Sequence, residues 1–137
     1  MGRGMMKFVA KGIVWMAGLF YAYGALVHGL NMLSLTGFDW MQAPWKWQVL
    51  DIIYLGLDVV VAVGFFRQWK VASIAFYLAA ISQIVLYTVF RAWIIDVPEE
   101  FAVSPEQVSY LTVLVVFHIV TLVLVTIALR MRHDHEL

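Results

Sequence analysis

Cysteine is absent from this chain and charged residues are scarce, and each scarcity removes a class of function. Without cysteine there are no disulfides, thiolate metal sites or cysteine nucleophiles. Charged residues make up 13% of the chain and the formal net charge is zero, so we expect no nucleic-acid partner. The motifs G-x-S-x-G, H-E-x-x-H, G-x-G-x-x-G and the P-loop are missing too, so hydrolytic catalysis has little support and we favour a protein that is not a stand-alone enzyme.

Long apolar runs dominate the chain instead. Hydrophobic residues make up 64% of its 137 residues, and a helix that crosses a bilayer needs about 20 mostly apolar residues. Four runs meet this requirement: 12–33, 48–66, 71–93 and 106–129. The first is too long for a typical secretory signal, so we expect it to be retained. The prediction is an all-α, polytopic membrane protein: one domain, folded as a four-transmembrane-helix up-down bundle in the lipid bilayer.

The connection 34–47 is rich in tryptophan. Trp40, Trp45 and Trp47 suit the interface between lipid and water, so we interpret this segment as an interfacial anchor on the membrane surface. The alternative is a lid that contacts a solute. The second connection, 67–70, is short and predicts a tight antiparallel hairpin.

The third connection, 94–105, is an acidic loop. Ser104 at its end is followed by proline and, three residues on, by Gln107, which is the pattern of a capped helix start. Small residues are also spaced along the first helix, where they allow a neighbouring helix to approach closely. This stripe consists of Gly18, Ala22, Ala25 and Gly29.

Lysine and arginine are distributed unevenly between the two sides of the predicted bundle. One side holds only Lys46 and Arg91, and the other holds the remaining seven of the nine. These seven are Arg3, Lys7, Lys11, Arg67, Lys70, Arg130 and Arg132. The positive-inside rule therefore predicts an inner (plasma) membrane protein with both termini in the cytoplasm. We interpret the polar tail at 133–136 as solvated rather than as a loose metal site.

Polar side chains inside the predicted helices fall into two layers. Asp51 and Asp58 are seven residues apart, two helical turns, and so share one face. By depth, His28, Asp51 and Arg91 form an outer layer, while Asp58, Gln83 and His118 lie near the midplane. Ionisable groups at membrane depth are costly and usually face a protein interior or a wet cavity. We therefore expect a polar intramembrane cavity open to the outer side.

Each of these residues has a structural alternative. Asp51 and Arg91 can form an ion pair that closes the top of the bundle, or Arg91 can reach the lipid headgroups. Gln83 can hydrogen-bond between helices, and a lone histidine on an apolar helix is more often packing than a ligand. Asp58 is the hardest to explain structurally, because an unpaired carboxylate at the midplane is costly. Closeness to His118 would keep both groups charged or let the two share a proton.

Three functions use this cluster. The first is a small integral subunit of a membrane complex. The second is a homo-oligomeric, proton-coupled transporter or channel that uses Asp58 and His118. The third is a haem or transition-metal site through His28 or His118. The two histidines differ in depth by about 10 Å, which is awkward for two ligands of one iron.

The layout of the chain also carries a resemblance. Four predicted helices with both ends inside, an interfacial segment after the first, and the stretch GALVHG at 24–29 resemble the DoxX-like group of small bacterial membrane proteins. The resemblance implies association with respiratory or quinone-linked redox complexes, and it transfers no functional residue. We therefore expect, first, a small inner-membrane subunit of a complex that is respiratory or redox-associated, with other membrane subunits or further copies of itself as partners.

Overall fold

A computed structural model describes residues 2–133, which are helical apart from their connections and contain no strand. The long helices are α1 (Arg3–Met32), α2 (Trp45–Arg67), α3 (Lys70–Thr88) and α5 (Pro105–His133). The short elements are η1 (Trp40–Gln42), α4 (Arg91–Ile95) and η2 (Glu99–Phe101). The four long helices are each long and apolar enough to cross a membrane. The all-helical prediction with four such helices is confirmed.

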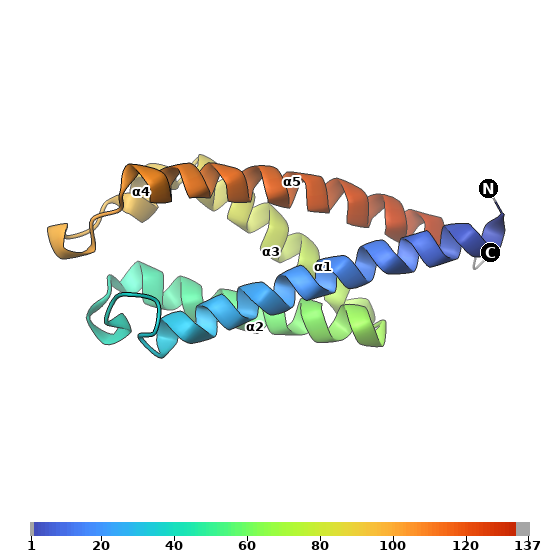
Figure 1. The fold of residues 1–137 in the computed structure, drawn as a ribbon, viewed down its shortest axis with the longest axis horizontal. Helices are drawn as coiled ribbons and strands as arrows, with labels where there is room; N and C mark the ends of the chain where they lie inside the picture. The colour runs from blue at the N-terminus through green and yellow to red at the C-terminus, as the bar shows by residue number, and fades with distance from the viewer. Residues whose placement is uncertain (1, 134–137) are drawn as a thin grey trace.

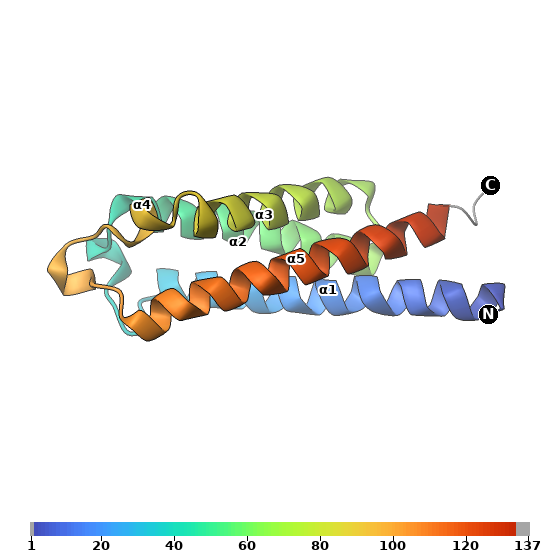
Figure 2. The same ribbon diagram turned by 90° about the horizontal axis from the view of Figure 1, so that it is seen from above.

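The four long helices run up and down, and each packs against two neighbours (Figures 1 and 2). α2 and α5 both contact α1 and α3, which closes the ring. The N-terminus and the end of α5 lie at the same end of the molecule as the α2–α3 turn (Figure 1). We call this the terminal end, and we call the opposite end, which holds the connections 33–44 and 96–104, the loop end.

The α2–α3 connection is the tight hairpin that its length predicts. α2 ends at Arg67, Gln68 adopts a left-handed conformation with φ 59°, and α3 begins at Lys70. Arg132 of α5 donates to Gln68 at 3.0 Å, which joins the last turn of the chain to this hairpin. The basic residues of α5 and of the hairpin therefore lie together at the terminal end.

Two helix starts follow the sequence in different ways. At α5 the predicted cap is confirmed: the Gln107 N–H donates to Ser104 Oγ at 3.2 Å and the Ser104 N–H donates to Gln107 Oε1 at 2.8 Å. α1 instead begins at Arg3, nine residues before the expected start at 12. The expectation followed the apolar run alone, whereas Lys and Arg are good helix formers and extend the helix beyond it.

The expected third helix, 71–93, is wrong at its end. α3 stops at Thr88, and the chain turns at Phe90 (φ −99°, ψ 15°) before α4 begins at Arg91. α4 is held by α2, because Lys46 donates to the carbonyls of Trp93 and Asp96. The break between α3 and α4 thus coincides with a tertiary contact, and such contacts can outweigh the local preference for helix. α2 itself begins at Trp45, earlier than the expected 48.

Close packing is concentrated at the terminal end. Its core consists mainly of alanine and valine with a few large rings, such as Tyr21 and Phe76, both at most 2% exposed. Gly18 lies against Phe65 and Phe66 of α2, as the small-residue stripe predicts. Two other members of the stripe do not pack against a neighbouring helix: Ala22 is exposed, and a Cβ at Gly29 would meet nothing within 4 Å. The inward face of α1 runs through Tyr21 and Gly24 instead, three residues apart.

Candidate functional site

A cavity of about 520 Å³ occupies the loop-end half of the bundle. All four long helices border it, together with residues 94–95 of α4 and residues 36–38 and 100–103 of the two loop-end connections. Its walls combine aliphatic and aromatic residues with a set of polar groups, and ligand sites of small molecules usually have this composition. Five of the six residues predicted as a polar cluster line this cavity: His28, Asp51, Asp58, Gln83 and His118.

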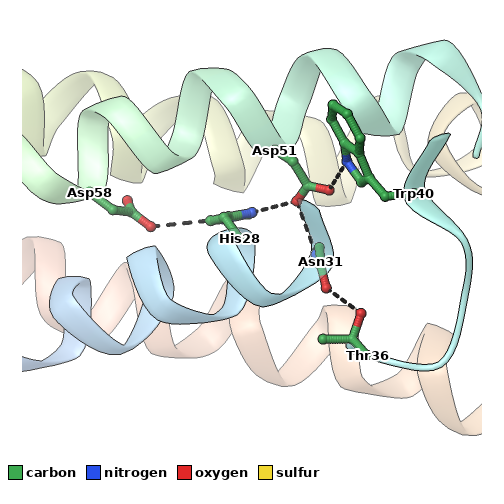
Figure 3. A network of polar contacts seen from close by, with 6 residues as sticks. All are labelled: His28, Asn31, Thr36, Trp40, Asp51 and Asp58. Carbon is green, nitrogen blue, oxygen red and sulfur yellow. Dashed lines mark hydrogen bonds and ion pairs between the residues drawn. The ribbon is translucent and has the colours of Figure 1, made fainter. Parts of the chain in front are cut away.

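Asp51 is the most heavily hydrogen-bonded residue of the site (Figure 3). Its Oδ1 lies 2.7 Å from His28 Nδ1 and accepts from Asn31 Nδ2 at 3.0 Å. Its Oδ2 accepts from Trp40 Nε1 at 3.0 Å. Asn31 in turn accepts from Thr36 Oγ1 at 2.6 Å. Asp51 is 6% exposed, and these partners supply the hydrogen bonds that a buried carboxylate requires.

His28 stands between the two carboxylates of α2. Its Nδ1 faces Asp51, and its Nε2 lies 3.8 Å from Asp58 Oδ2. The spacing of seven residues puts both aspartates on one face of α2, and His28 of α1 fits between them (Figure 3). Its ring also stacks on Tyr54 at 5.9 Å between centroids, and the Tyr54 hydroxyl bonds Ser82 at 2.8 Å. We call this set the Asp51–His28–Asp58 row.

At the inner end of the cavity, polar atoms lack partners. Four side-chain atoms there are buried and make no hydrogen bond, one from each long helix. In folded proteins nearly all buried polar atoms are hydrogen-bonded, so four exceptions around one cavity mark it as unusual. They are Tyr21 OH, Asp58 Oδ1, Gln83 Oε1 and His118 Nδ1, and all four residues line the cavity.

Arg91 is the predicted cluster residue that lies off the cavity. Its Nε donates to the Tyr87 carbonyl at 2.7 Å, and within residues 2–133 it forms no ion pair with Asp51. The ion pair considered between Asp51 and Arg91 is therefore not formed in the described residues, and Arg91 belongs to α4, beyond the end of α3. Within the described residues, the histidine that lies within 4 Å of the Asp58 carboxylate is likewise His28 and not His118.

The three tryptophans interpreted as anchors have different environments. Trp45 is 67% exposed and stacks edge-on against Trp93. Trp40 donates its indole N–H to Asp51, and Trp47 donates to the Ile94 carbonyl at 2.9 Å. Trp45 therefore has the environment expected of an anchor, whereas Trp40 and Trp47 hold the walls of the cavity.

The connection 34–47 borders the cavity, as the lid alternative requires. Thr36, Gly37 and Phe38 line it, and so does Trp47. The Trp47 ring packs between Phe38 at 5.8 Å and Phe101 at 6.1 Å. This aromatic cluster joins two connections and α2 at the loop end of the cavity.

Sequence reasoning missed several functional side chains. Asn31 lies three residues after His28, and Tyr54 three residues after Asp51, so helical spacing places each on the face of a predicted site residue. That signal was available. The contribution of Trp40 and Phe101 had no such signal, because both lie in irregular connections whose course depends on tertiary contacts.

The arrangement is poorly suited to a metal ion. Within residues 2–133 no group of three or more His, Asp and Glu side chains is placed to hold one. The two carboxylates approach His28 from opposite sides of its ring, so their oxygens do not converge on one point. Both nitrogens of His28 face carboxylates, so neither is directed at an iron shared with His118.

Comparisons of this chain with family models, with curated proteins and with solved structures find no match. The interpretation of the site therefore rests on its own geometry.

Proposed function

We propose that this chain is a multi-pass inner-membrane protein with both termini in the cytoplasm and its loop end on the outer side. Each long helix turns large apolar side chains outward, such as Leu19 of α1 and Val113 of α5, which are 62% and 60% exposed. Lipid is the solvent that accepts such surfaces. The basic residues of the α2–α3 hairpin and of the last turn of α5 lie together at the terminal end, which supports the cytoplasmic assignment.

Its function, in this proposal, is to bind a small molecule in the cavity from the outer side. The observation that carries the proposal is the set of unpartnered polar atoms, one from each long helix, around a cavity of about 520 Å³. Cavities of roughly 300–1,000 Å³ accommodate drug-sized ligands. A polar atom left without a partner costs about 1–3 kcal/mol, and more in an apolar interior. A bound molecule with matching polar groups removes this cost.

Proton-coupled transport is the second candidate, and the Asp51–His28–Asp58 row favours it. A histidine between two carboxylates can accept a proton at one nitrogen and release it at the other. The terminal end argues against a continuous path, because Val14, Val61 and Phe76 there are at most 2% exposed. A proton that reached Asp58 would meet a closely packed apolar core. Binding from one side therefore fits the geometry better than conduction.

The chain also fits a role as a subunit, as the resemblance to DoxX-like proteins implies. Helix faces rich in exposed apolar residues can pack against other membrane subunits or further copies of the chain as well as against lipid. In that role the cavity would supply a ligand site to a complex, respiratory or redox-associated by the resemblance. Co-purification from mild detergent tests this part of the proposal.

The absence of cysteine makes the topology and the access to the cavity directly testable. Single cysteines at Glu99 and Gly4 report the two ends: in intact spheroplasts an impermeant maleimide should label Glu99→Cys only. Leu114→Cys lines the cavity, whereas Val113→Cys faces outward. A small water-soluble thiol reagent should modify the first and spare the second. Labelling of Gly4→Cys from outside, or equal modification of both α5 cysteines, would refute the proposed orientation or access.

Binding is tested by blocking the cavity. In nanodiscs, a panel of cationic, neutral and anionic arylalkyl compounds should include at least one that raises the unfolding temperature of the wild type. Leu114→Trp fills the cavity and should abolish this shift, whereas Val113→Trp should retain it. If no compound shifts the wild type, or the filled variant responds equally, the proposed binding function is wrong.

A further inference from the structure

The walls of the cavity carry acidic residues, and the basic side chains that accompany them in the described residues are histidines. Asp51, Asp58 and Glu100 line it, and within the described part of the chain no lysine or arginine does. Nine of the lining residues are Phe, Tyr or Trp. Carboxylates surrounded by aromatic rings attract organic cations, because both the charge and the ring quadrupoles favour a positive group.

The two basic residues of the loop-end half are engaged elsewhere. Lys46 is 8% exposed and donates to backbone carbonyls of α4 and of the residue after it. Arg91 donates to the Tyr87 carbonyl. Each satisfies the carbonyl groups where a helix ends, so neither neutralises the cavity. Its acidic side chains keep histidine as their ionisable partner.

Asp58 is the carboxylate left available. Asp51 accepts from three donors, but Asp58 has only His28 Nε2 at 3.8 Å and leaves Oδ1 without a partner. Gln83 Oε1, a second acceptor, is also unpartnered. Asp58 and Gln83 are 2% and 6% exposed, so water does not reach these atoms freely. The unpartnered oxygens of Asp58 and Gln83 are hydrogen-bond acceptors, so these two atoms match a ligand that donates hydrogen bonds.

We propose that the cavity binds a lipophilic amine in its protonated form, with the ammonium N–H directed at the Asp58 carboxylate and the apolar part against the aromatic walls. This inference rests on the proposed binding function and names its ligand class. An aliphatic amine supplies the positive charge that the lining lacks and the donor that the unpartnered acceptors lack. A carboxylate or phosphate ligand would meet like charge, and a neutral hydrocarbon would leave the acceptors unpaired.

The test compares four probes of one shape, measured by calorimetry on the full chain in nanodiscs, with empty nanodiscs as the baseline for partition into lipid. The probes are N,N-dimethyl-4-phenylbutylamine, its quaternary trimethylammonium form, the neutral carbon isostere and 5-phenylpentanoate. We expect the tertiary amine to bind most tightly. A hydrogen bond to a charged group is worth about ten- to hundredfold in affinity, so the neutral isostere should be weaker by that factor. The quaternary form should also be weaker, since it has no N–H.

Three variants test whether Asp58 is the carboxylate that binds the amine. Asp58→Asn should reduce amine affinity about ten- to hundredfold and leave the neutral isostere unchanged. Gly24→Ala keeps the carboxylate but displaces it, since its Cβ would lie 2.5 Å from Asp58 Oδ2, and should also weaken the amine. Glu106→Gln removes an acid of the same end that does not line the cavity, and should bind as the wild type does.

Each other outcome is decisive. If the neutral or anionic probe binds as tightly as the amine, the ligand class is wrong and the binding function stands. If the quaternary form matches the tertiary amine, the assignment of an N–H donor is wrong. Amine binding unchanged in both Asp58→Asn and Gly24→Ala removes Asp58 from the site. If no probe binds above the empty nanodisc, the inference fails, and the cavity-filling experiment decides separately whether the binding function fails with it.

Discussion

The substitution Gly24→Ala tests the closest approach in the site. An ideal Cβ at Gly24 would lie 2.5 Å from Asp58 Oδ2 and 3.4 Å from Asp58 Cγ. Ordinary contact for a Cβ begins at 3.4 Å, so the oxygen would have to withdraw by about 0.9 Å (3.4 minus 2.5). That movement changes its 3.8 Å approach to His28 Nε2. The lack of a side chain at Gly24 therefore leaves the space that the Asp58 carboxylate occupies.

The magnitude follows from two opposing terms. Glycine to alanine within a helix gains about 1 kcal/mol, whereas forcing extra volume into a packed site costs about 1–3 kcal/mol. Gly12→Ala is the matched control, because it lies in the same helix and its Cβ meets nothing within 4 Å. The helix term is common to both variants. We therefore expect Gly24→Ala to be about 1–3 kcal/mol less stable than Gly12→Ala.

Equilibrium unfolding in the same detergent measures this difference, and a double-mutant cycle assigns it to Asp58. In an Asp58→Ala background the carboxylate is gone, so Gly24→Ala should no longer destabilise relative to Gly12→Ala. Equal stability of the two glycine variants in the wild-type background would refute the steric reasoning. A difference that persists in the Asp58→Ala background would assign the clash to another neighbour.

Three other predictions use matched pairs or a direct assay. Trp40→Phe removes the indole donor to Asp51 and should lower the free energy of unfolding by about 1–3 kcal/mol. Trp45→Phe, at an exposed tryptophan, should change it by less than about 0.5 kcal/mol. Equal losses in the two variants would contradict this role of Trp40. Ser104→Ala should cost about 1 kcal/mol through the lost cap, and Ser109→Ala, on the exposed side of α5, almost nothing, by the same assay. In proteoliposomes loaded with a pH-sensitive dye, proton flux through the wild type that Asp58→Asn abolishes would establish the transport candidate, and no flux would reject it.

The sequence was sufficient for the four long helices and for one cap. Apolar runs of about 20 residues locate a helix that can span a bilayer, and Ser104 with Gln107 located a helix start to the residue. The ends of α1 and α3 were wrong for opposite reasons. Hydropathy does not detect a helix that continues into polar sequence, as α1 does at Arg3. It also does not detect a break inside an apolar run, such as the one after Thr88, where Lys46 of α2 binds carbonyls beyond the break.

The site could be predicted in composition and only partly in geometry. Spacing put Asp51 and Asp58 on one face, and depth brought His28 to the level of Asp51. Depth also placed Arg91 beside them, but depth measures position along the axis and not direction around it. Arg91 turns to a backbone carbonyl. Its replacement as the partner of Asp51 is Trp40, from a connection whose path no periodicity describes.

The missing information was the register between α1 and α2, and small residues fix it. α1 lies directly against α2 at Gly18, where a Cβ would meet Phe65 and Phe66, and at Gly24, where a Cβ would meet Asp58. The two contacts are six residues apart, so together they set both the rotation and the axial position of α1. With that register set, His28, four residues beyond Gly24, comes to lie between the carboxylates of α2. The position of His28 is thus a consequence of where Gly18 and Gly24 allow α1 and α2 to meet. Gly24 also leaves room for the Asp58 carboxylate.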